Sequence, residues 1–275
     1  MVLFILKISK NKNKRVNKRI YVALISYTAA VTIAEIVTVY HSKTGGMGIH
    51  AILLLFLILH SSLERKKDFS NLLKVLTLVP LIRLLSISTP SVVIQPMYQY
   101  FIISIVLVLA VLLLIKHVGI RKEEVGFRWG DPRVQLMVAL TGVLFGWIEY
   151  GILEPQLMIE NLTTKALFVY GIVLIVYTGT SEELIFRGMI LSNAERMFGR
   201  GAGLIFVSVL FTSMHTIHQS MVDLAFVFGV GLFVSENKKH IRRLTLSRNN
   251  KCNAFTDTAL YVIFPFILLA VFDFL

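Results

Sequence analysis

The chain has 275 residues, of which 56% are hydrophobic and only 16% are charged. Soluble domains are about 45–50% apolar and about 25% charged. This composition therefore excludes a soluble globular protein and predicts an all-α, polytopic bundle of transmembrane helices. The net charge of +12 would suggest nucleic-acid binding in a soluble protein, but here we expect the basic residues to set the membrane topology and predict no nucleic-acid partner. The single Cys252 excludes an intrachain disulfide and a cysteine-rich metal site.

Apolar runs of about 17–25 residues predict eight to nine membrane spans. In chain order, the expected spans are residues 20–40, 47–63, 72–88, 97–115, 135–153, 166–191, 203–217, 222–235 and, as the last candidate, 259–272. The third span is the weakest, because Lys74, Pro80 and Arg83 interrupt it.

A polar connector over residues 116–133 is the clearest internal boundary. We therefore predict two parts: residues 1–124, which contain N-terminal transmembrane helices, and residues 125–275, which form a second intramembrane domain. The first one or two helices are interpreted as dispensable for the second part.

Basic residues alternate between successive loops. They precede the first expected span and follow the second, fourth, sixth and eighth, whereas the alternate loops contain only Lys43. By the positive-inside rule, this pattern places the N-terminus in the cytoplasm. The first residues have their apolar run before their basic run, the reverse of a secretory signal, so we expect no cleavable signal peptide.

One polar motif interrupts the sixth expected span: residues 178–188 read T-G-T-S-E-E-L-I-F-R-G. Each charge costs roughly 2.5–3.5 kcal/mol to insert into a membrane, which indicates a function. On a helix, Glu183 and Arg187 are four residues apart and share a face, whereas Glu182 is about 100° away. We predict that Arg187 orients Glu183 and that Glu182 faces a cavity. The alternative is a buried ion pair that only fixes helix packing.

Histidines of the seventh span form a second candidate site. His215 closes the pattern F-T-S-M-H, and His218 follows one turn later. A carboxylate and an imidazole in a dry cavity can activate a water molecule, so His215 is a candidate partner for Glu182. His218 is interpreted as a solvated loop residue. Glu35 and Glu149 also fall inside expected spans, and Glu149 is either a supporting carboxylate or an interface residue.

The pattern E-E-x-x-x-R at residues 182–187, followed by F-x-x-x-H at residues 211–215, resembles the CPBP family (CAAX-protease and bacteriocin-processing, or Abi, proteins). These are intramembrane metalloproteases that include the type II CAAX prenyl endopeptidases. The resemblance covers about residues 125–266. It implies that Glu182 and His215 activate the water that attacks a peptide bond, with Glu183 and Arg187 in support.

The resemblance also implies a third motif, H-x-x-x-N, on a later helix. At that place this chain has Asn253 and Asp257, so an asparagine stands where the family has histidine. The resemblance further implies zinc, with Glu182 and His215 as ligands. It implies a membrane-associated protein or peptide as substrate, which in part of the family is prenylated.

Three functions are compatible with these patterns. The first is a metal-dependent intramembrane endopeptidase that processes CAAX-type substrates. The second is a catalytically weak family member that acts as a membrane scaffold or immunity protein. The third is a transporter that uses the carboxylates and His215 as a proton relay, although neither internal repeats nor paired broken helices are visible.

Overall fold

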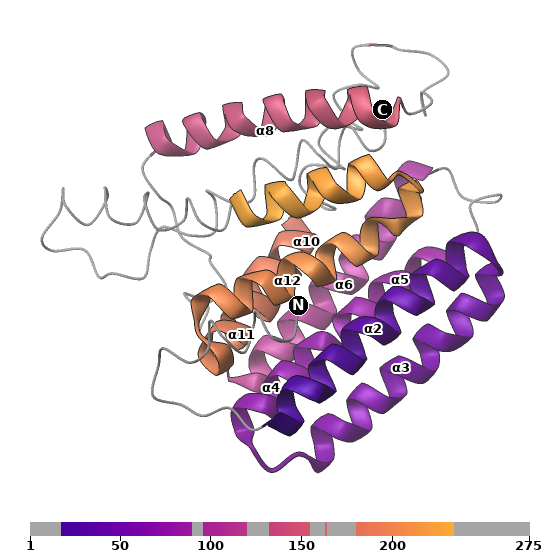
Figure 1. The fold of residues 1–275 in the computed structure, drawn as a ribbon, viewed down its shortest axis with the longest axis vertical. Coiled ribbons are helices and arrows are strands. Elements are labelled where there is room, and N and C mark those ends of the chain that lie inside the picture. Colours follow the sequence, from indigo (N-terminus) through magenta and orange to yellow (C-terminus); the bar gives the residue numbers. More distant parts are fainter. Residues whose placement is uncertain (1–17, 90–95, 120–131, 155–162, 164–179, 234–275) are drawn as a thin grey trace, which may run out of the picture. The chain divides into compact units, whose positions relative to one another are not determined.

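The computed structural model describes residues 18–89, 96–119, 132–154, 163 and 180–233, and within these ranges it contains helices and no strand (Figure 1). The chain divides into two compact units. The first is Met1–Ser88 with Met189–Gln219, and the second is Thr89–Gly188 with Ser220–Leu275.

The helices follow one another with short connections. They are α2 (Lys18–Tyr40), α3 (Lys43–Leu63), α4 (Lys67–Leu76), α5 (Leu78–Ser88), α6 (Pro96–Val118), α8 (Pro132–Leu153), α10 (Thr180–Glu183), the π-helix η2 (Leu184–Ile190), α11 (Leu191–Phe198), α12 (Arg200–Met214) and the 3₁₀-helix η3 (His215–His218). An apolar helix, Met221–Phe233, comes next.

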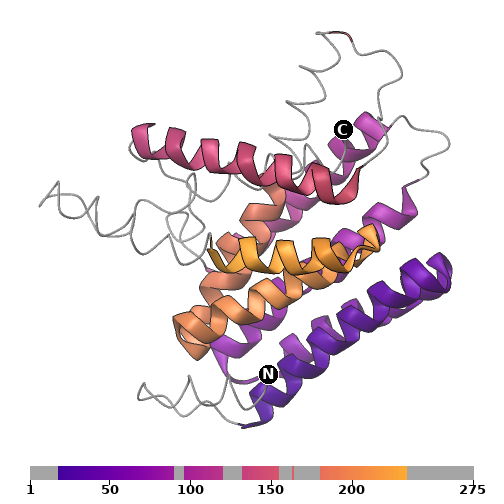
Figure 2. The ribbon, with the colours of Figure 1, turned by 45° about the horizontal axis from the view of Figure 1, so that its top comes forward.

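The first unit begins with a hairpin of α2 and α3, which lie side by side in Figures 1 and 2. Ser42 caps α3, because its hydroxyl accepts a hydrogen bond from the Gly45 amide at 3.1 Å. Gly46 allows the close approach: a Cβ atom there would lie 2.7 Å from Cα of Thr38 on α2. This hairpin is therefore held by backbone contact as well as by apolar side chains.

The third expected span is broken into α4 and α5 at Thr77. Pro80 has no amide hydrogen to donate to the carbonyl four residues earlier, which favours a break at this place. The hydroxyl of Thr77 donates instead to the Lys74 carbonyl at 2.5 Å. The sequence pattern predicted a weak span here, and the break is its structural form.

The α11 and α12 helices complete the first unit. Gly199 connects them with φ of 80°, a conformation that favours glycine. The α12 helix packs against α2, and α11 packs against α4. The candidate His215 is thus attached to a helix that lies against the N-terminal hairpin.

The second unit contains α6, α8, α10 and the helix Met221–Phe233. Phe145 of α8 makes edge-on ring contacts with Phe226 and Phe233, with ring centroids 6.2 and 5.7 Å apart. These aromatic contacts hold α8 against the last described helix.

Five described helices are long and apolar enough to cross a membrane: Lys18–Tyr40, Lys43–Leu63, Lys67–Ser88, Tyr98–Val118 and Arg200–His218. They confirm the first four expected spans and the seventh, although the third begins at Lys67 rather than at residue 72. The fifth and eighth expected spans correspond to α8 and to the shorter helix Met221–Phe233.

The remaining expectations fall wholly or partly outside the described residues. The sixth span is described only from Thr180, and the ninth not at all, so the count of eight to nine stays a prediction. The predicted domain boundary at residues 124–125 also lies outside the described residues.

Candidate active site

Glu182 and Glu183 end the short α10 helix, directly before the π-helix η2. Glu183 and Arg187 are buried, with 4% and 6% of their surface exposed, whereas Glu182 is partly exposed. A π-helix is a rare conformation that occurs frequently at functional sites. The sequence predicted an ordinary α-helix here, because the apolar pattern does not distinguish the two.

The charges of this motif act on one another. Arg187 is attracted most strongly by Glu183 and less strongly by Glu182. This order agrees with the face-sharing expected for residues 183 and 187. The buried pair can therefore carry charge compensation inside the bundle, while the more exposed Glu182 carboxylate is available to a reactant.

His215 caps the C-terminal end of α12 and begins the 3₁₀-helix η3. Its Nδ1 atom lies 3.0 Å from the Phe211 carbonyl oxygen, and the two ring centroids are 4.4 Å apart. A carbonyl oxygen only accepts hydrogen bonds, so Nδ1 must carry the hydrogen and donate it. In the neutral imidazole the lone pair then belongs to Nε2, the nitrogen that can act as a base or ligand. Phe211 thus fixes the tautomer of His215.

His218 lies closer to this site than the sequence predicted. It is part of the ordered 3₁₀-helix η3 and only partly exposed, and its ring centroid is 5.7 Å from that of His215. Gln219, with φ of 55°, ends this turn. His218 therefore belongs to the surroundings of His215 and is not a fully solvated loop residue.

Glu149 interacts with an acid that sequence reasoning missed. Glu149 and Asp223 are 1% and 0% exposed, and their carboxyl groups interact with each other. This burial excludes the interface position considered for Glu149. An isolated acid in the apolar helix Met221–Phe233 was the available signal for Asp223.

A second missed group lies in the same unit as His215. Glu35 of α2 and Arg83 of α5 form a buried ion pair, with 2.8 Å between Arg83 Nε and Glu35 Oε1. His50 of α3 is also buried, and its Nε2 lies 3.5 Å from the same carboxylate oxygen. Two opposite charges in separate spans were visible in the sequence, but their pairing required the fold.

A catalytic zinc usually has three protein ligands drawn from histidine and carboxylate. Among the residues that the structure describes, no three His, Cys, Asp or Glu side chains gather where they could hold a metal ion. Glu182 and His215 together are one ligand short of that number. Asn253 and Asp257, the candidates for the third motif, lie outside the described residues.

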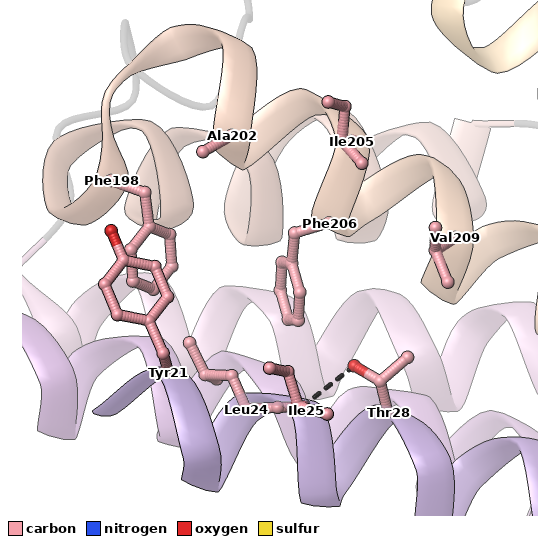
Figure 3. A pocket seen from close by; sticks show the side chains of 9 residues that line it. All are labelled: Tyr21, Leu24, Ile25, Thr28, Phe198, Ala202, Ile205, Phe206 and Val209. Carbon is pink, nitrogen blue, oxygen red and sulfur yellow. Dashed lines mark hydrogen bonds between the residues drawn. The ribbon is translucent and has the colours of Figure 1, made fainter. Parts of the chain in front are cut away.

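Tyr21 and Phe198 border a small cavity between α2 and the α11–α12 corner (Figure 3). Its volume is about 30 Å³, and side chains that are almost entirely apolar line it. A cavity of this size and polarity is too small for a peptide and offers water few hydrogen-bond partners. None of the predicted site residues lines it, so it is a packing defect of the first unit and no substrate site.

Comparison with known families identifies one match. Residues 164–241 match the family model described as Type II CAAX prenyl endopeptidase Rce1-like. The matched range includes both polar motifs, residues 182–187 and 211–215, and ends before Asn253. No curated protein and no solved structure gives a significant match to the chain.

Proposed function

Since residues 164–241 belong to the Rce1-like family of type II CAAX prenyl endopeptidases, we propose that this integral membrane protein is an endopeptidase. It hydrolyses a peptide bond in a membrane-associated protein or peptide. The observation that supports this most directly is that the family match spans both the Glu182 motif and the His215 motif. The family resemblance also suggests a prenylated substrate.

Glu182 is the proposed general base. As the more exposed of the two adjacent carboxylates, it accepts a proton from water while the water oxygen bonds to the peptide carbonyl carbon. When the C–N bond breaks, the same proton is delivered to the leaving nitrogen. Glu183 and Arg187 support this role by keeping a compensated charge pair beside it.

His215 is the proposed second acceptor for the attacking water. Its Nδ1 hydrogen is committed to the Phe211 carbonyl, so Nε2 accepts a hydrogen bond. Two acceptors would take the two water hydrogens and direct an oxygen lone pair toward the substrate. Glu182 and His215 belong to different compact units, and their shared action is inferred from the family match and the motif order.

Zinc is a separate proposal. The described residues provide too few ligands for a catalytic zinc, so no step above requires a metal. If zinc is needed, 1,10-phenanthroline should abolish cleavage and added zinc should restore it. Cleavage that persists in the chelator would reject this part of the proposal alone.

The test uses the purified full chain in detergent micelles with an internally quenched, farnesylated CAAX peptide. We expect turnover by the wild type and a loss of about 10²–10⁴-fold in kcat for Glu182→Gln and for His215→Ala, the range typical of general acid–base groups. Glu195→Gln is the matched control, because Glu195 is a partly exposed carboxylate of α11 whose contact is with Arg200 at 3.9 Å. Equal turnover by all variants would contradict the proposal. An inactive wild type would favour the scaffold alternative.

A further inference from the structure

Arg83 connects three helices of the first unit at the segment that carries His215. Its Nε–H donates to Glu35 Oε1 on α2 at 2.8 Å, and an Nη2–H donates to the Met214 carbonyl at the end of α12 at 2.7 Å. Glu35 is 0% exposed and Arg83 is 6% exposed. We call these two contacts the Glu35–Arg83 bridge.

The position of the Met214 carbonyl gives the bridge its significance. The last carbonyls of a helix have no partner within the helix, and a cation near them is favourable for the helix dipole. The Met214 carbonyl and the His215 amide belong to one planar peptide unit. Fixing this carbonyl therefore fixes the plane from which the His215 side chain projects.

A second contact holds the preceding residue. The hydroxyl groups of Thr32 on α2 and Ser213 on α12 lie 2.9 Å apart. Two successive residues before His215 are thus attached to the N-terminal helices. Arg83 is also close enough to His218 for their charges to interact, which places the guanidinium beside the η3 turn.

We propose that Arg83, oriented by Glu35, is a positioning residue for His215, and that α2 and α5 are required parts of the active protein. The inference rests on the proposed function, because it gives His215 its role in hydrolysis. Thr32, Glu35 and Arg83 all lie outside residues 164–241, the range that matches the family.

A purely structural ion pair is the competing explanation, so the experiment needs a readout on His215 itself. Diethyl pyrocarbonate modifies neutral, accessible imidazoles, and mass spectrometry gives the labelling rate of each histidine in the full chain. His60 is the internal reference, because it lies in the same unit, is 34% exposed and bonds to Tyr27 at 2.7 Å, away from the bridge.

The decisive variant is the double substitution Glu35→Gln/Arg83→Met. It removes both charges together and leaves no lone buried charge, so it should fold with a melting temperature close to that of the wild type. Because a misplaced catalytic group costs as much as about 10²-fold in rate, we expect kcat to fall by up to that factor with little change in KM. The ratio of His215 to His60 labelling should also change.

Arg83→Lys provides a second variant. A lysine keeps the charge but cannot reproduce two contacts in a fixed fork. We expect it to retain the melting temperature and to show the altered His215 labelling and reduced kcat. It decides the question if the double variant fails to fold.

Ser70→Ala is the matched control, since it removes a buried hydrogen bond to the Ser61 carbonyl (2.6 Å) in the same unit without touching α12. Wild-type labelling and kcat in folded bridge variants would overturn the inference. If the wild type cleaves no peptide, the proposed function fails, but the labelling ratio still tests the bridge.

Discussion

Glu183 and Arg187 are the most deeply buried charges of the first motif, and this burial predicts different effects for the two adjacent carboxylates. Removing one partner of a buried ion pair typically costs about 3–5 kcal/mol, because the other charge loses its compensation. We therefore expect Glu183→Gln to lower the melting temperature in detergent strongly, and Glu182→Gln to lower it little. A stable Glu183→Gln protein with no activity would instead place Glu183 in the chemistry.

At the residue scale, the sequence predicted which side chains matter but not what they contact. The spacing of Glu183 and Arg187 was sufficient to predict their interaction, because a helix places residues four apart on one face. The partnership of Glu35 with Arg83 joins residues on different helices, and so does that of Glu149 with Asp223. No local spacing encodes such pairs, although each member was visible as an isolated charge in an apolar run.

At the element scale, the close packing of α2 and α3 makes a direct prediction. A Cβ atom at Gly46 would meet the backbone of Thr38, whereas one at Gly48 on the same helix would meet nothing within 4 Å. We expect Gly46→Ala to destabilise the hairpin by about 1–3 kcal/mol, as overpacking does. Gly48→Ala should be neutral, and the melting temperatures of the two variants in detergent give the comparison. Equal melting temperatures would mean that the hairpin opens at little cost.

Elements were predicted well where apolar runs are long and poorly where helices change type. The apolar runs predicted α2, α3, α6 and α12 close to their observed bounds. The change from α-helix to π-helix after Glu183 depends on a few backbone hydrogen bonds, which hydrophobic periodicity does not report. The break at Thr77 had a partial signal in Pro80.

The whole molecule provides a test of the N-terminal helices. The sequence pattern suggested that the first one or two are dispensable, whereas α2 packs against α3 and α12 and supplies Glu35. We expect a chain that lacks residues 1–41 to lose peptide cleavage, and co-expression of residues 1–41 as a separate peptide to restore it. Restoration by the wild-type peptide but not by its Glu35→Gln form would connect the effect to the bridge. Full activity of the truncated chain alone would show that α2 is dispensable.

The orientation in the membrane also remains a prediction, and the two ends of α3 can test it. Lys43 and Arg65 are both exposed and flank this helix. In a Cys252→Ser background, Lys43→Cys should react with a membrane-impermeant maleimide in intact cells. Arg65→Cys should react only after permeabilisation, because the basic loops are expected in the cytoplasm. The reverse pattern would invert the topology.

The central claim is that this protein hydrolyses a peptide bond with a water molecule activated by Glu182. The most direct measurement is mass spectrometry of a farnesylated CAAX peptide after incubation with the full chain in H₂¹⁸O. The account predicts a shortened peptide with one ¹⁸O atom in its new carboxyl group, and loss of this product with Glu182→Gln. An intact peptide with the wild-type protein, or the same product in equal amount from Glu182→Gln, would contradict it.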